Sequence, residues 1–144
     1  MPLAKDLTGV HDMPEQAIRI GDTGPQYLTG MGGSTQALAT VIGGPTGSTL
    51  LECNPTSSSV SSVIFSSLTE QAKEYQLDNG SGNAMNVFPP TGGSFNGLTT
   101  NTSFSIPANK VAYVTRLGPI PPITTGSVSM GSVASDRWIF VLSN

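Results

Sequence analysis

The chain has few charged side chains. Only 10% of its 144 residues are Asp, Glu, Lys or Arg, against about 25% in an average soluble protein. Its six basic residues stand singly and the formal net charge is −3, so no basic patch is present that would follow a nucleic-acid backbone. We therefore expect no nucleic-acid partner. A surface of Ser, Thr, Asn and Gly stays soluble without repelling a similar neighbour, a property that a repeated assembly tolerates.

Residues that commonly carry chemistry are scarce as well. The one cysteine, Cys53, cannot form an intrachain disulfide and is expected to be a small buried hydrophobe in a strand. The one histidine, His11, lies near the start of the chain, and together with Cys53 it does not supply a usual zinc ligand set. Glu70 and Glu74 are the nearest acidic pair, but we expect them on a solvated face rather than flanking a sugar.

Two polar turns superficially suggest ligand sites. The glycine-rich stretch 43–49 lacks the lysine of a phosphate-binding loop and does not open a helical pattern. The Asp and Asn side chains of residues 78–83 lack the spacing of an EF-hand calcium loop. We therefore predict that the protein is not an enzyme and has no catalytic residue, bound metal or cofactor.

Long hydrophobic runs are missing too. No apolar stretch approaches the length of a membrane-spanning helix, so we expect no membrane partner. The first sixteen residues, MPLAKDLTGVHDMPEQ, lack the apolar core of a signal peptide. The expectation is a protein made and assembled in a cytosol.

What the chain does contain is period-two alternation between Gly, Pro and Asn punctuation, which is typical of half-buried strands. The pattern predicts an all-β domain over residues 26–144, built as an antiparallel β-sandwich or barrel of jelly-roll-like type. The predicted strands are Gln26–Met31, Gln36–Ile42, Ser48–Cys53, Ser61–Ser66, Glu74–Asp78, Asn83–Phe88, Ser103–Ile106, Val111–Arg116 and Arg137–Leu142.

Several connections carry their own signals. Asn79-Gly80 favours a type I′ hairpin turn, and Thr69–Tyr75 has the composition of a helical turn. Residues 117–134 lack apolar periodicity and are expected to form a long surface excursion. The last strand is expected to place Trp138 and Phe140 in the core.

The N-terminal segment differs from the rest, because residues 1–22 carry six of the fifteen charges. Asp12 as N-cap, Glu15 in a capping box and Gly21 as C-cap predict a short helix within an arm over residues 1–25. Such a short helix needs a surface to pack on, either its own β domain or a neighbouring subunit. The apolar residues expected at that interface are Leu7, Val10, Met13, Ile18 and Ile20.

The segment Asn83–Arg116 resembles a segment of small virion proteins of tailed bacteriophages. Its order is a strand ending in Val87-Phe88-Pro89-Pro90, then Thr91-Gly92-Gly93, Phe95-Asn96-Gly97-Leu98, an alternating strand around Phe104, and a Pro-Ala-Asn-Lys turn. The patches Leu7-Thr8-Gly9-Val10, Met13-Pro14-Glu15-Gln16-Ala17, Leu28-Thr29-Gly30 and Gln36-Ala37 are similar to the start of such proteins. Residues 117–134 depart from the pattern by inserting a longer loop.

The resemblance implies a structural protein of the virion, commonly trimeric. One reading is a capsid decoration (cement) protein that binds the major capsid protein on the head surface. The alternative is a tail or head fibre, or a host-surface adhesin, with the loops 54–62 and 117–134 as the contact surface. Those loops nearly lack the aromatic and acidic side chains with which sugar readers bind, which favours the decoration protein.

Overall fold

The computed structural model describes residues 24–45, 47–56, 61–119, 124–125, 128–129 and 136–144. Most of the predicted arm, including its helix, lies outside these residues. The same holds for the predicted interface residues Leu7, Val10, Met13, Ile18 and Ile20.

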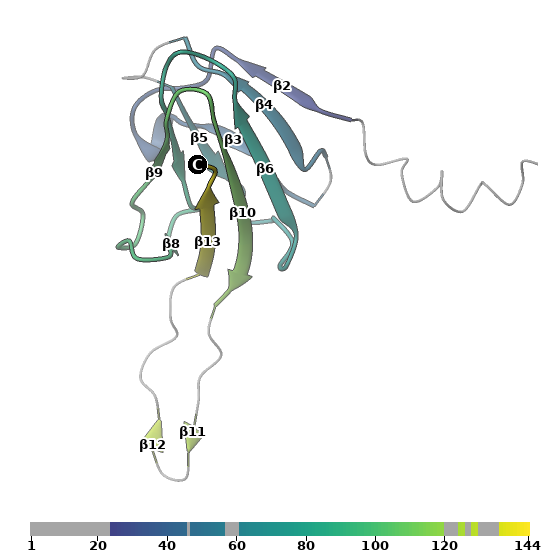
Figure 1. Ribbon diagram of the computed structural model, residues 1–144. Coiled ribbons are helices and arrows are strands. Elements are labelled where there is room, and N and C mark those ends of the chain that lie inside the picture. The colour runs from purple at the N-terminus through teal and green to yellow at the C-terminus, as the bar shows by residue number, and fades with distance from the viewer. Residues whose placement is uncertain (1–23, 46, 57–60, 120–123, 126–127, 130–135) are drawn as a thin grey trace, which may run out of the picture.

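Nearly all regular structure in the described residues is β-strand, so the predicted all-β class is confirmed (Figure 1). One sheet contains, in spatial order, β2 (Gln26–Thr29), β4 (Leu50–Asn54), β6 (Glu74–Asn79), β10 (Lys110–Gly118), β13 (Asp136–Leu142) and β8 (Gly93–Phe95). The other contains β3 (Thr40–Ile42), β5 (Ser62–Phe65), β7 (Met85–Phe88) and β9 (Phe104–Ile106). A 3₁₀ turn, η2 (Gln36–Leu38), precedes β3, and no helix of the described residues is both long and apolar enough to cross a bilayer.

Each of the nine predicted strands overlaps an observed one, but β8 is not among the predictions. The three residues of β8 follow Pro-Pro-Thr-Gly, and their first residue is itself a glycine, so the sequence there indicates a turn. The expected excursion after β10 contains a small hairpin of its own, β11 (Thr124–Thr125) with β12 (Val128–Ser129). This hairpin forms a separate two-stranded sheet and stands apart from the two large sheets in Figure 1.

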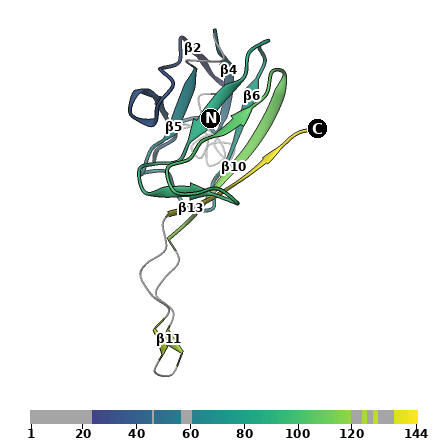
Figure 2. The same ribbon diagram turned by 90° about the vertical axis from the view of Figure 1, so that its left-hand side faces the viewer.

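The chain alternates between the two large sheets from β2 to β10. Even-numbered strands enter the six-stranded sheet and odd-numbered strands enter the four-stranded sheet. In Figure 2 β5 lies on one side of the molecule, while β6 and β10 lie on the other. Because each strand is followed by a crossing to the other sheet, β4 returns beside β2 in the same direction. Gln26 pairs with Leu51, 25 residues later, and Thr40 pairs with Val63, 23 residues later.

The predicted antiparallel arrangement is therefore wrong for most of the strand pairs. In the two large sheets, β2–β4, β4–β6, β8–β13, β3–β5 and β5–β7 are parallel, while β6–β10, β10–β13 and β7–β9 are antiparallel. The comparison with a jelly roll fails for the same reason, because its strands are antiparallel. Turn residues specify that the chain reverses, but they do not specify which sheet it enters next.

The predicted hairpin turn at Asn79-Gly80 is also wrong. Asn79 is the last residue of β6 and is fully buried. Its Nδ2 group donates to the backbone oxygens of Asn83 (2.7 Å), Ile106 (3.1 Å) and Pro107 (3.0 Å). A type I′ turn requires a positive φ at Gly80, and Gly80 is not among the glycines that have one. The hydrogen bonds from the Asn79 side chain to three carbonyl oxygens therefore outweigh the preference of Asn-Gly for a hairpin turn.

The helical turn expected at Thr69–Tyr75 is absent from the structure. Ala72 has a φ of 64°, a left-handed conformation that interrupts a helix, and its N–H donates to the Arg116 carbonyl at 2.8 Å. Glu74 and Tyr75 already belong to β6, which pairs with β10. Strand pairing has replaced the weak helical propensity of these residues.

Among the described residues, one hydrophobic core is built from the inward faces of both sheets. At its centre Phe65 of β5 contacts Tyr75 of β6 edge-on, with ring centroids 5.2 Å apart, and lies 4.8 Å from Trp138 of β13. Trp138 is 1% exposed, as predicted. Phe140 is half-buried and stacks on Phe104 at 3.9 Å, so it packs against the core rather than within it.

Candidate interaction surface on the six-stranded sheet

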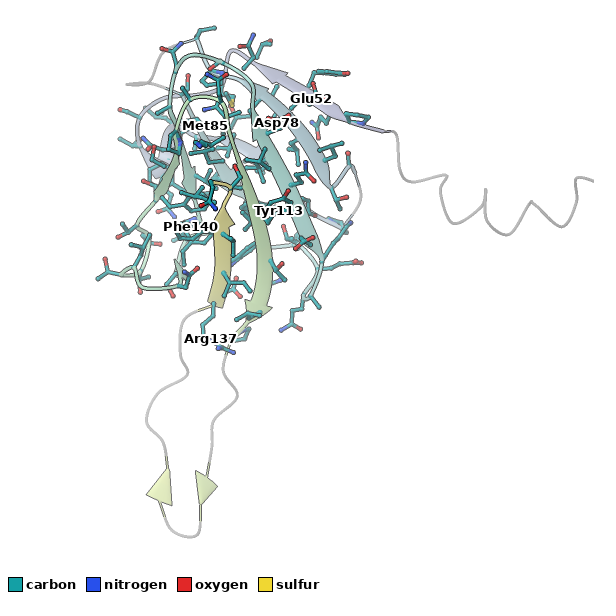
Figure 3. All side chains as sticks on the ribbon, viewed as in Figure 1. Glu52, Asp78, Met85, Tyr113, Arg137 and Phe140 are labelled. Atoms are coloured by element: carbon teal, nitrogen blue, oxygen red, sulfur yellow. The ribbon has the colours of Figure 1, made fainter. Side chains whose placement is uncertain are left out.

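The outward face of β10 and β13 presents apolar side chains to solvent. The alternation that buries Ala112 and Val114 directs Tyr113 outward, where it lies opposite Val141 in the antiparallel register. Ile139 is the next outward residue of β13. Tyr113, Ile139 and Val141 are 38%, 39% and 62% exposed. We call these three residues the outer apolar strip, and Figure 3 shows Tyr113 on this face of β10.

The same sheet becomes acidic toward β2. Glu52 of β4 pairs with Asp78 of β6 in parallel register, so the two carboxylates are neighbours on one face. Tyr27 of β2, 71% exposed, lies beside Glu52, and the three side chains help to line a cavity of about 330 Å³. Within the described ranges no group of three His, Cys, Asp or Glu side chains is placed to hold a metal ion. Two adjacent carboxylates alone do not make a metal site.

Cys53 lies in β4 next to this acidic pair, and it is buried as the sequence predicts. Its Sγ lies 3.9 Å from the Leu51 carbonyl oxygen. Burial, and secondarily the negative charge of Asp78, raise the pKa of the Cys53 thiol from 9.0 to about 12. Nucleophilic cysteines usually have a lowered pKa, so neither the burial nor the raised pKa of this thiol favours reaction in the folded protein.

We expect Cys53 to resist alkylation by iodoacetamide at pH 8 in the native protein and to react readily once the chain is unfolded. The thiolate is the reacting species, and in the fold it is suppressed by the raised pKa as well as by burial. Mass spectrometry of protein treated with and without denaturant measures the difference. Rapid stoichiometric labelling of native protein would contradict the assignment.

The polar turn after β6, a weak calcium candidate in the sequence, is held by its own amides. The Asn79 side-chain oxygen accepts from Ser81, while Asn83 Nδ2 donates to the Pro55 carbonyl at 3.1 Å. The Asn79 Nδ2 group also donates to the carbonyl oxygen of Asn83 in the turn and to those of Ile106 and Pro107, which lie at the end of β9. These hydrogen bonds connect the turn to the end of β9.

An ion pair between Arg116 and Asp136 lies at the opposite end of the sheet and is not among the sequence predictions. Arg116 Nε donates to both carboxylate oxygens of Asp136, at 3.0 and 3.1 Å, and its Nη1 donates to the Thr69 carbonyl. The indole Nε1 of Trp138 donates to the same carboxylate at 3.0 Å. The i, i+2 spacing of Asp136 and Trp138 on a strand was the available signal, since such residues share a face. This network supports the strand ends from which the excursion leaves.

The candidate residues of the sequence do not come together at one site among the described residues. Glu70 and Glu74 are exposed, as expected, and the loops 54–62 and 117–134 are only partly described. The outer apolar strip was missed, because its members come together only through the pairing of β10 with β13. A comparison of the chain with protein-family models, with curated proteins and with solved structures finds no match. The exposed outer apolar strip offers contact area for a partner.

Proposed function

We propose that the chain is a structural virion protein of a tailed bacteriophage, a capsid decoration (cement) protein that stabilises the head shell. The observation that carries the proposal is the outer apolar strip, where Tyr113, Ile139 and Val141 are exposed together on a regular strand pair. Exposed apolar groups that cluster are typical of surfaces that another protein covers. The resemblance of Asn83–Arg116 to small virion proteins supplies the class of partner, the major capsid protein.

For the fold we propose a β-sandwich rather than a closed barrel. The inward faces of the two sheets share one core, in which Phe65 contacts Tyr75 and Trp138 across the sheets. Within the described residues β2 and β8 each have one neighbour and form the two edges of the six-stranded sheet. Open edges favour two packed sheets over a barrel, which has none.

For assembly we propose a homotrimer on the capsid surface, made in the cytoplasm of a bacterial host and anchored by the 1–25 arm. The sparse charge of the β domain supports close packing of copies, because similar neighbours repel one another little. Burying each of the apolar arm residues would contribute about 1.5–3 kcal/mol before ordering costs, and repetition over a shell multiplies modest contacts.

Replacing Val141 by glutamate is expected to reduce incorporation of the full-length protein into particles at least tenfold, because it buries a charge in the proposed contact. Val41→Glu is the matched control, since Val41 is similarly exposed (67%, against 62% for Val141) but lies in the four-stranded sheet. Quantitative mass spectrometry of purified virions gives the copy number of each variant. Deleting residues 1–22 tests the arm in the same assay.

Equal copy numbers for Val141→Glu, Val41→Glu and the unchanged protein would exclude the outer apolar strip as the contact. A wild-type copy number of hundreds per particle is the value expected for a capsid component. The alternative, a fibre or adhesin, is favoured by one observation: the β11–β12 hairpin pairs separately from both large sheets. Only a few copies per particle would select that alternative.

A further inference from the structure

A second cavity, of about 290 Å³, lies between the β8 segment and the ends of β10 and β13. Arg137 enters it from β13, beside Ser94 of β8, its partner in the parallel register. Leu98, Leu117 and Ile139 contribute apolar wall. Figure 3 shows Arg137 near the start of β13, far from the acidic pair Glu52 and Asp78.

The guanidinium of Arg137 is incompletely satisfied. Its Nε is buried and has no hydrogen-bond partner in the part of the chain that the structure describes. Arg116 on the neighbouring strand differs, since it binds Asp136 and two backbone carbonyls. A buried donor without an acceptor is costly, more so when it belongs to a charged group. Arg137 as a whole is half-buried and lines the cavity, so a ligand bound there could supply the missing acceptor.

The lining of the cavity restricts the charge of that ligand. Arg137 is the charged residue among the described residues that line it, and no carboxylate is among them. Asn96, which also lines the cavity, accepts from the Phe140 N–H through Oδ1, so the Nδ2 end of its amide is the end available to a ligand. One guanidinium balances the charge of a singly charged anion, and its planar fork fits a planar carboxylate. The doubly charged form of phosphate would leave one negative charge without a cation in this cavity.

We propose that this cavity binds a carboxylate carried on a short apolar stem. The carboxylate accepts two parallel hydrogen bonds from the Arg137 guanidinium, including one from Nε, and the stem lies against Leu98, Leu117 and Ile139. The volume of about 290 Å³ is sufficient for a short branched acid. The carboxylate belongs either to a free small acid or to an acidic side chain of a bound protein, and the chemistry of recognition is the same for both.

The test is an NMR titration of full-length protein in which the Nε–H signals of arginine are followed. Sodium isobutyrate should shift the Arg137 Nε–H signal saturably, while the isosteric neutral amide isobutyramide should not, and inorganic phosphate should bind more weakly. Arg137→Lys keeps the charge but loses the two parallel N–H donors, so isobutyrate binding should weaken about tenfold. Because this variant has no Arg137 Nε–H, its binding is followed by the indole N–H signal of Trp138, which also lines the cavity. Lys110→Gln, which removes a cation outside the cavity, should leave the affinity unchanged. The indole N–H signal of Trp138 verifies that each variant is folded.

N-acetylglutamate amide separates the two sources of the carboxylate. Tighter binding of this compound than of isobutyrate indicates an acidic side chain of a protein, and the reverse order indicates a free acid. The proposal is overturned if Arg137 Nε–H does not respond to either acid, if isobutyramide shifts it equally, or if Arg137→Lys binds as well as the unchanged protein. None of these readouts depends on particles, so they stand apart from the proposed virion function.

Discussion

Replacing Trp138 by alanine is expected to lower the free energy of unfolding by about 3–5 kcal/mol, a large part of the stability of a domain of this size. The indole is 1% exposed and contacts Phe65 and Phe95. Its removal leaves a cavity between the sheets that the surrounding aromatic rings cannot fill without moving. It also removes one donor from the Asp136 carboxylate.

Urea unfolding followed by far-UV circular dichroism measures this loss, because the fluorescence of the one tryptophan disappears with the mutation. Val141→Ala is the control on the same strand, and its exposed side chain should cost less than about 1 kcal/mol. Trp138→Phe preserves most of the packing and isolates the hydrogen bond to Asp136, for which about 1–2 kcal/mol is expected. A Trp138→Ala protein as stable as Val141→Ala would show that the two sheets do not pack around this side chain.

Replacing Asn79 by aspartate is expected to destabilise the protein by about 3 kcal/mol or more at neutral pH, since it places an acceptor-only carboxylate against acceptors. Three backbone oxygens that now receive the Nδ2 group would face a negative charge. The folded-state pKa of the new carboxyl should therefore rise above the value of about 3.9 in the unfolded chain. The ionised unfolded state is then favoured increasingly as the pH rises past about 3.9, until the folded-state pKa is passed.

The stability deficit of Asn79→Asp relative to the unchanged protein should accordingly be small near pH 3.5 and large at pH 7. Denaturant unfolding at several pH values measures it. Asn109→Asp is the matched control, because Asn109 is an exposed turn residue whose N–H binds Ser81 in the same neighbourhood. That variant adds the same charge without burying it. If both variants show the same dependence on pH, the buried amide is not what secures the end of β6.

The alternation of apolar and polar side chains was enough to locate most strands, because each strand buries one face. Trp138 and Val114 follow this pattern directly. Strand direction was not available from it, since the same alternation serves parallel and antiparallel pairs equally. Asn79 shows a second limit: its Asn-Gly sequence favours a turn, and only the carbonyls of Ile106 and Pro107, 27 and 28 residues away, explain why it extends a strand instead.

Features of the candidate sites that depend on neighbouring residues were predictable from the sequence, whereas features that depend on distant strand pairing were not. Tyr113 was expected in a strand, but its neighbour Val141 is fixed by a register that joins residues 28 positions apart. The sequence pattern places Arg137 at the start of a core strand, but it predicts neither the pairing of Arg137 with β8 nor its unsatisfied Nε. Cys53 was foreseen as a buried thiol because one residue and its immediate strand context sufficed.

The crossing of the chain between the sheets also sets the order in which the molecule is able to fold. None of the parallel strand pairs can form as a local hairpin, because the residues that pair in them are more than twenty positions apart in the sequence. Ser94 of β8 finds its partner Arg137 only 43 residues later. During synthesis β8 therefore waits for β13 before the six-stranded sheet is complete. Folding dominated by such distant pairings is slow, on the order of milliseconds to seconds, and leaves strand edges exposed until its last step.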